Sequence, residues 1–276
     1  MRTGTIKLAA AAAVALGAMH AACAADWSDN SISYRYGTKF QEPFNGQDIK
    51  KNIVNFSHVS GYKYGSNFVS IDLLNSDSTD FGAQEAYVVY RHTLDLGKVT
   101  GKDFKFGPAR GLGVTAGFDW NTKNDGGYGS RKRMLVVGPT VFLDVPGFLN
   151  VSLLALKESN DPAAAGLPKR YSYDTHAMLT AAWGIPLGAT GLSFEGFSNF
   201  IGHKGKDEFG GNTAPEFNFD AQVMYDVSPL LGMGKNTLKA GLEYQYWRNK
   251  FGNDYKGPAG PGAFAKTPMV RIEYHF

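Results

Sequence analysis

In this 276-residue sequence, the side chains that could take part in catalysis or binding occupy alternate positions of short segments. Asp220 lies between Phe219 and Ala221, and Glu243 follows Leu242. Alternation with period two is typical of strands whose two faces meet different surroundings. The carboxylates therefore share one face of each strand with other polar side chains. On that face they would either pair with cations on neighbouring strands or bind a polar solute.

This alternation predicts that one face of the strands carries charges, amides and aromatic rings together. Its members are Arg35, Asp72, Arg91, Asp119, Asp174, Glu195, Asp220, Glu243, Arg271 and Glu273; Ser70, Ser193, Asn199, Asn218 and Gln222; and Phe68, Tyr87, Phe142, Phe197 and Trp247. A ring facing water is unfavourable unless a flat solute stacks on it, which is worth about 1–3 kcal/mol per base in nucleic-acid binders. Two interpretations stay open, because the charges could simply pair with one another and the rings could simply fill space.

Signals for catalysis or nucleotide binding are weak. His176 near Asp174 suggests a base with its orienting group, but a nucleophilic serine within reach is also required. Gly111, Gly113 and Gly117 lie inside an expected strand, where glycine relieves crowding or bends the sheet. We expect no enzyme and no cofactor.

A calcium site is also considered at Asp77 and Asp80, in an expected loop. That loop lacks the glycine and terminal glutamate of an EF-hand. Solvated acids are the favoured interpretation, and we expect no metal.

The alternation repeats along the chain and predicts an all-β protein with about 12 strands. The expected strands span residues 30–39, 51–60, 64–74, 84–95, 110–121, 132–144, 148–157, 170–184, 191–201, 216–227, 237–248 and 267–276. Most of them reach the 9 to 11 residues that a tilted strand needs to cross a bilayer.

The expected connections alternate in length, which is the arrangement of bacterial outer-membrane barrels. Residues 61–63, 145–147 and 185–190 form short turns, and residues 40–50, 122–131, 158–169, 202–215 and 249–266 form long loops. In lipid every backbone N–H and C=O must find a partner, and a closed barrel leaves no edge. We therefore predict a transmembrane antiparallel up-and-down β-barrel over residues 25–276. A soluble β-sandwich is the alternative, but the core of a sandwich would be apolar, whereas many of these strands have a polar inward face.

Aromatic residues near the strand ends would form the girdles at the two membrane interfaces. The candidates are Tyr34, Tyr36, Trp120, Tyr171, Trp183, Tyr225 and Tyr246.

The first 24 residues are expected to be a signal peptide. Arg2 and Lys7 precede an apolar run, and Ala22-Cys23-Ala24 offers a small-x-small cleavage site. Lipidation at Cys23 is the alternative. Cys23 is the only cysteine, so the mature chain would hold no thiol nucleophile or disulfide. The formal net charge of +3 falls to +1 without Arg2 and Lys7, which argues against nucleic acid as a partner.

The quoted residues resemble the nucleoside-specific channel family, the Tsx-like outer-membrane proteins. The likeness lies in four segments, residues 40–44 with 51–53, 105–108 with 119–120, 192–200, and 244–248, the third being the most specific. The aromatic Phe276, which closes an alternating strand, resembles the signal that barrel-assembly machinery recognises.

The resemblance implies a channel for facilitated diffusion of nucleosides across the outer membrane of a Gram-negative bacterium. It implies phage or colicin reception in some members, although the long loops here look shorter than in the enterobacterial ones. Outer-membrane lipid surrounds such barrels. Phe197 and Asn199 lie within the matching motif, whereas the other candidates follow from strand parity: Glu195, Phe68, Asp72, Arg91, Asp220, Glu243 and Arg271. A non-selective pore and a structural or receptor barrel without transport are the alternatives.

Overall fold

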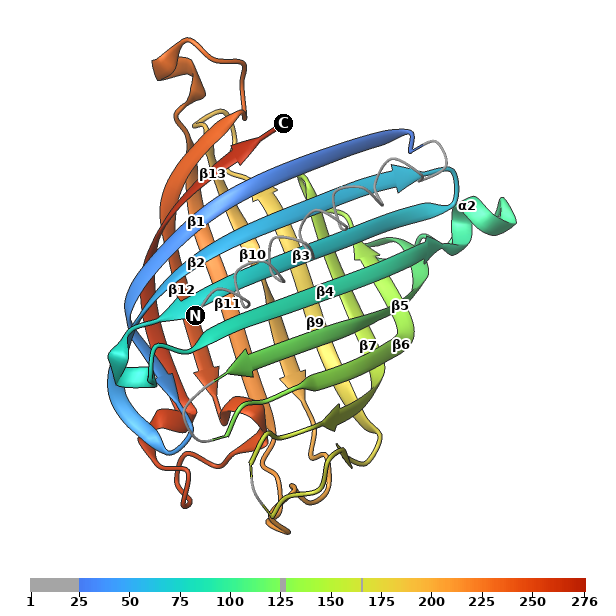
Figure 1. Ribbon diagram of the computed structural model, residues 1–276. Helices are drawn as coiled ribbons and strands as arrows, with labels where there is room; N and C mark the ends of the chain where they lie inside the picture. The colour runs from blue at the N-terminus through green and yellow to red at the C-terminus, as the bar shows by residue number, and fades with distance from the viewer. Residues whose placement is uncertain (1–24, 125–127, 165) are drawn as a thin grey trace.

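The computed structural model describes residues 25–124, 128–164 and 166–276, so the predicted signal peptide lies outside the described residues. Within that part, twelve long antiparallel strands close into a barrel (Figure 1). The predicted all-β, up-and-down barrel is confirmed. Across the same residues, no helix is long and apolar enough to cross a membrane.

The elements follow the predicted strands closely. They are β1 (Trp27–Glu42), β2 (Asn45–Tyr62), β3 (Gly65–Ser76), η2 (Ser78–Asp80), β4 (Gln84–Asp95), α2 (Leu96–Thr100), β5 (Ala109–Asn124), β6 (Lys132–Leu143), β7 (Phe148–Asn160), β8 (Tyr171–Ser172), β9 (His176–Pro186), β10 (Leu192–Ile201), β11 (Glu216–Asp226), η3 (Ser228–Leu231), β12 (Leu238–Arg248), η4 (Lys250–Gly252), η5 (Pro261–Ala263) and β13 (Phe264–His275). The two-residue β8 pairs with the end of β7 and takes no part in closing the wall.

Closure joins the two ends of the strand order. β1 pairs with β13, with Tyr34 opposite Ile272, and β6 pairs with β7, with Val137 opposite Ala155. Each long strand therefore has a partner on both sides. This satisfies the backbone groups that a bilayer leaves without water.

The two faces of each strand meet different surroundings. Leu135, Leu242 and Val270 project outward and are 65%, 68% and 54% exposed. Glu243, directly after Leu242, is 2% exposed. Large apolar side chains left bare on the outside of a closed sheet are explained by contact with lipid chains, which is the surface of a transmembrane barrel.

Connections at one end of the barrel, here called the short-turn end, include residues 144–147 and 187–191. The last described residue is held there, since the Phe276 N–H donates to the Asn30 carbonyl at 2.9 Å. The connection over residues 96–108 also lies at this end and contains α2. Asp95 caps that helix by accepting from the N–H groups of Gly97 and Lys98.

The opposite end, here called the long-loop end, corrects one prediction. Residues 40–50 were expected to form a long loop, but β1 and β2 run to Glu42 and from Asn45, with a turn at Pro43 and Phe44. The strands extend because Phe40 and Ile49 face inward and are buried, which keeps the pair within the packed structure.

One expected strand also needs correction. The strand expected over 170–184 is broken at residues 173–175, so Tyr171 and Asp174 lie outside the wall strands. Trp183 lies on the outer face of β9, opposite Gly196, and is only 8% exposed because it packs between Phe194 and Phe219 at 5.5 and 5.7 Å.

The interior is also less polar than predicted. Two apolar clusters occupy inward positions in the described residues: Phe40, Ile49, Ile53 and Met269, and Val136, Leu154, Leu156 and Met178. Aliphatic packing thus fills part of the interior on β6, β7 and β9, whereas the predicted lining of charges, amides and rings contained no aliphatic side chain.

Candidate functional site

All nine residues predicted for the channel lining project into the barrel. The register shows the parity: Phe68 lies opposite Arg91, Phe197 opposite Asp220, and Arg35 opposite Arg271. Inward direction follows because these side chains reach past neighbouring strands to one another. The inward set comprises Phe68, Asp72, Arg91, Glu195, Phe197, Asn199, Asp220, Glu243 and Arg271.

A belt of charges crosses the middle of one wall, from β3 through β1 to β12. Arg35 on β1 pairs with Asp72 on β3, and its other nitrogen donates to Glu243 on β12 at 3.1 Å. Arg271 on β13 donates to Glu243 at 2.9 Å and to Gln222 at 2.8 Å. Each guanidinium serves acceptors on separate strands, as its fork of donors allows. The belt ties these strands together.

The remaining predicted charges have partners of their own. Arg91 pairs with Asp119 and donates to the carbonyls of Tyr90 and Phe118 at 2.9 and 3.2 Å. Glu195 accepts from Lys239 at 3.0 Å. The Glu195 and Arg91 side chains keep 22% and 19% of their surface exposed, against 1% for Glu243 at the centre of the belt and 21% for Asp72 at its edge.

Two rings stand out along the interior. Phe68 on β3 and Phe197 on β10 are each 38% exposed although both point inward and lie within their strands. Their strands are six places apart in the ring of twelve, so they belong to opposite walls. Asp220, the cross-strand neighbour of Phe197, accepts from Gln245 at 2.9 Å, and Asn199 lies two positions further along β10.

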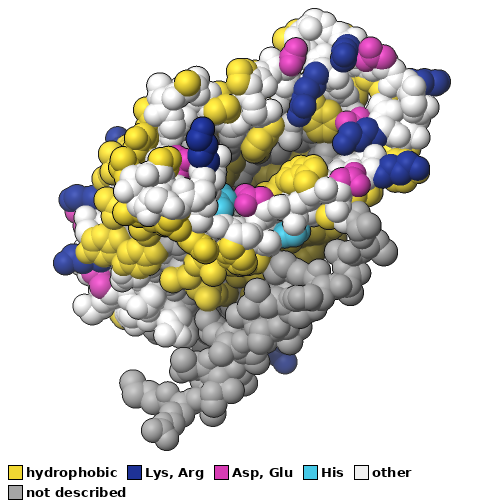
Figure 2. Space-filling view, turned by 90° about the horizontal axis from the view of Figure 1, so that it is seen from above, with side chains coloured by type: hydrophobic (Ala, Val, Ile, Leu, Met, Phe, Trp, Pro, Cys, Tyr) yellow, Lys and Arg dark blue, Asp and Glu magenta, His cyan; other side chains and the backbone are white. Residues whose placement is uncertain are grey.

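We call the open half those inward residues of the middle and the short-turn end that are not buried; Ser33, Met224 and Glu273 also face inward toward this end but are buried. Its members are half-buried or exposed: Ser57, Ser66, Phe68, Arg91, Thr180, Glu195, Phe197 and Lys239. Figure 2 shows the molecule from this end, with apolar surface inside a rim that carries charges of both signs. A solute entering from this end would meet rings and charged groups side by side.

The buried charged residues at the long-loop end form what we call the closed half, and all of them belong to ion pairs except Glu216, which accepts from the Trp247 indole N–H at 2.6 Å. They are Glu42, Lys51, Asp80, Lys123, Lys132, Glu158, Lys204, Glu216 and Lys250. Lys51 donates to Glu42 at 2.6 Å, and Lys204 donates to Glu158 at 2.7 Å. Charges buried to this degree are stable only when paired.

The loop after β12 completes the closed half. Lys250 donates to the Gln41 carbonyl at 2.6 Å, and the Phe251 ring lies 3.8 Å from the Lys132 nitrogen. Gly262 packs so closely on the β1–β2 hairpin that a Cβ there would lie 2.1 Å from the Glu42 carbonyl oxygen. The loop is therefore folded against the barrel mouth.

Burial also alters the acid–base properties of this loop. Desolvation lowers the pKa of Lys250, an effect that the nearby cations Lys51 and Lys123 reinforce and that Glu42 opposes. In the neighbouring loop, burial raises the pKa of the Tyr173 phenol.

The wall from β4 to β7 differs from the charged belt. Thr93, Thr115, Thr140 and Ser152 face inward and join hydroxyl to hydroxyl at 2.9, 2.6 and 2.8 Å. A solute inside the barrel would thus have charges on one side and hydroxyls with aliphatic groups on the other.

The sequence did not predict some residues of the interior. Lys204 and Lys250 lie in loops, where strand parity gives no direction. His176 was considered as a base oriented by Asp174, but its Nδ1 lies 2.8 Å from the Asp174 main-chain oxygen and not from the carboxylate. Within the described residues, His, Cys, Asp and Glu side chains do not gather in groups that could hold a metal ion.

Comparison with known proteins gives distant structural likeness. Family models and curated sequences yield no match. Among solved structures, a KdgM porin in complex with disordered oligogalacturonate superposes with a TM-score of 0.45 at 11% identity, over 89% of this chain and 99% of that one. The translocator domain of the autotransporter NalP from Neisseria meningitidis gives 0.45 at 11% identity, over 99% and 97%. OccK7 from Pseudomonas aeruginosa gives 0.33 at 9% identity, over 90% and 99%.

Proposed function

We propose that the protein is an outer-membrane channel of a Gram-negative bacterium that binds and passes small, flat, polar solutes, with nucleosides as the substrate class. The observation that carries the proposal is the pair of exposed inward rings, Phe68 and Phe197, on opposite walls of the open half. Water-exposed rings gain free energy when a planar solute covers them.

Each ring has a charged residue directly across from it on the neighbouring strand. Arg91 faces Phe68, and Asp220 faces Phe197. A nucleoside combines a flat base with sugar hydroxyls, and Arg91 offers a partly exposed hydrogen-bonding group beside Phe68, whereas Asp220 is 6% exposed and is held by Gln245. Asn199 and Glu195, on the same face of β10 as Phe197, would add an amide and a carboxylate.

The test is conductance of the purified barrel in a planar bilayer, titrated with adenosine or thymidine. Selective binding predicts dose-dependent block of the current. Phe197→Ala and Phe68→Ala should each weaken the block, whereas Phe118→Ala, an outward ring of similar exposure, should leave it unchanged. A current that millimolar nucleoside does not alter would indicate the non-selective pore instead.

The closed half favours a second candidate, a structural or receptor barrel without transport. Its side chains fill the long-loop end with buried ion pairs, and the 249–263 loop rests on the β1–β2 hairpin. Phage or colicin binding would then use the surface loops at this end. A barrel that inserts but passes no current would support this candidate over the channel. In either case the chain would be inserted by the barrel-assembly machinery.

A further inference from the structure

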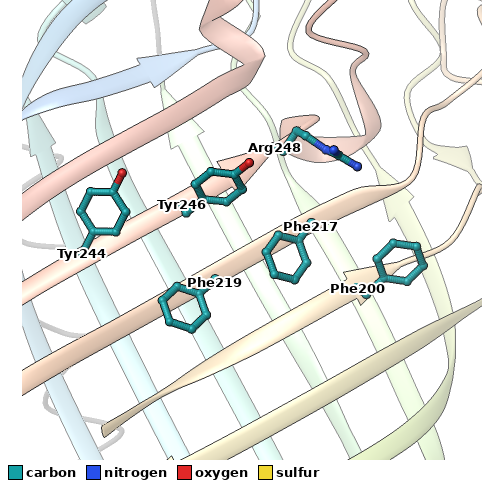
Figure 3. Close-up of a pocket in the computed structure, with 6 residues that line it drawn as sticks. All are labelled: Phe200, Phe217, Phe219, Tyr244, Tyr246 and Arg248. Carbon is teal, nitrogen blue, oxygen red and sulfur yellow. The ribbon is translucent and has the colours of Figure 1, made fainter. Parts of the chain in front are cut away.

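A groove runs along the outside of the barrel over β10, β11 and β12. It has a volume of about 590 Å³ and is lined by Phe200, Phe217, Phe219, Tyr244, Tyr246 and Arg248. Figure 3 shows the five rings spread along three neighbouring strands, with Arg248 at one end of the row. These positions alternate with the inward Asn199, Asn218 and Gln245, so the groove belongs to the lipid-facing surface.

The rings form a continuous apolar floor toward the long-loop end. Phe217 meets Tyr246 edge to face at 6.0 Å, and Tyr246 meets Phe264 of β13 at 5.0 Å. Phe200 and Tyr244 remain 47% and 42% exposed. A long, narrow, apolar occupant such as an acyl chain fits this floor.

Two cations lie at the end of the floor. In the register of β12 and β13, Arg248 is opposite Phe264 and Lys266 is opposite Tyr246, so the two cations are diagonal neighbours on the outer face. The Lys266 nitrogen lies 4.6 Å from the centre of the Phe264 ring. Among the described residues, neither Arg248 nor Lys266 forms an ion pair within 4.0 Å.

The cations belong to a wider asymmetry at the long-loop end. Lys50 and Arg133 also face outward there, while the carboxylates of neighbouring strand ends, such as Glu158 and Glu216, face inward. The outward Asp48 is paired with Lys39. The outer surface at this end therefore carries excess positive charge.

We propose that this face binds a phosphorylated lipid of the leaflet at the long-loop end. An acyl chain lies over the five rings, and a phosphate sits between the Arg248 guanidinium and the Lys266 ammonium. A guanidinium matches phosphate with two parallel hydrogen bonds, and each cation near a membrane surface strengthens binding of anionic lipid roughly fivefold. The site does not depend on what passes through the barrel.

The proposal can be tested by native mass spectrometry of the barrel in neutral detergent. Bis-phosphorylated lipid A, a monophosphorylated form and phosphatidylethanolamine are added separately at equal concentration. We expect retention in the order of phosphate charge, and a loss of roughly twentyfold or more for lipid A in the double variant Arg248→Gln with Lys266→Gln. The matched control is Arg133→Gln, which removes an outward cation of β6 at the same end, away from the groove, and should change retention little.

Three results would overturn the proposal. Equal retention of the three lipids would mean that the surface binds acyl chains without recognising the phosphate. Unchanged lipid A retention in the double variant would place the phosphate elsewhere. Lipid-free protein that runs as a dimer, and becomes monomeric in the double variant, would assign the groove to a second copy of the chain.

Discussion

The closed and open halves of the interior use the same kinds of side chain in opposite ways. In the closed half Lys204 and Glu158 are 2% and 3% exposed and are held by each other. In the open half Glu195 and Arg91 are also paired, but they keep part of their surface free beside the exposed Phe197 and Phe68. A charged lining therefore does not by itself make a binding surface. Charges that are fully enclosed by partners hold the wall, and those left partly open can meet a solute.

The largest effect should come from removing a carboxylate of the closed half. Glu158→Leu leaves Lys132 and Lys204 buried without their counter-charge, so we expect it to lower the free energy of unfolding by about 3–5 kcal/mol. Urea unfolding in lipid vesicles, followed by tryptophan fluorescence, measures the change. The matched variant Glu195→Leu in the open half should cost less than Glu158→Leu, because Glu195 and Lys239 keep 22% and 15% of their side-chain surface exposed, against 4% and 2% for Glu158 and Lys204. Equal losses of unfolding free energy in the two variants would contradict the distinction between the closed and open halves.

The next effect concerns the rings of the open half. Phe197→Ala removes one stacking surface and should weaken nucleoside block by about fivefold or more, from a stacking contribution of about 1–3 kcal/mol. If one solute touches both rings, the double variant with Phe68→Ala should show coupling in a double-mutant cycle. Strictly additive losses would place the rings in separate sites.

A smaller change should follow at the mouth of the closed half. Phe251 packs edge to face on Trp247 at 4.9 Å and lies under the Lys132 nitrogen. Phe251→Ala removes this ring and should raise single-channel conductance while leaving nucleoside affinity unchanged. An unaltered conductance would mean that the loop does not restrict the path.

The smallest effect is a pH dependence at Lys250. Because burial lowers its folded pKa below the unfolded value, the charged form opposes loop docking at neutral pH. That cost should disappear as the pH rises from the lowered folded pKa to the unfolded value of about 10.4. The loop should therefore resist proteolysis better in alkaline buffer. Lys250→Met should resist cleavage at all pH values, and a variant that keeps the wild-type pH dependence would assign it to another group.

The sequence predicted the wall better than the interior. Strand parity placed Asp220 and Glu243 inward because alternation with period two follows from strand geometry itself. It could not predict Lys250, which is positioned by loop packing. It also missed Leu154 and Leu156, since neighbouring strands such as β6 carry apolar residues on both faces, as in Leu135 and Val136. The positions of Lys250 and of the two leucines both depend on contacts between residues far apart in the chain.

Thiol labelling of single-cysteine variants in vesicles, on a Cys23→Ser background, tests whether the open half binds a solute. Cysteine in place of Phe68 or Phe197 should react with a charged, water-soluble thiol reagent, and adenosine or thymidine should slow both reactions. Cysteine in place of the outward Phe118 should react only with a lipid-soluble reagent. If nucleoside protects neither inward position, or if the charged reagent fails to reach them, the open half is not a solute-binding surface.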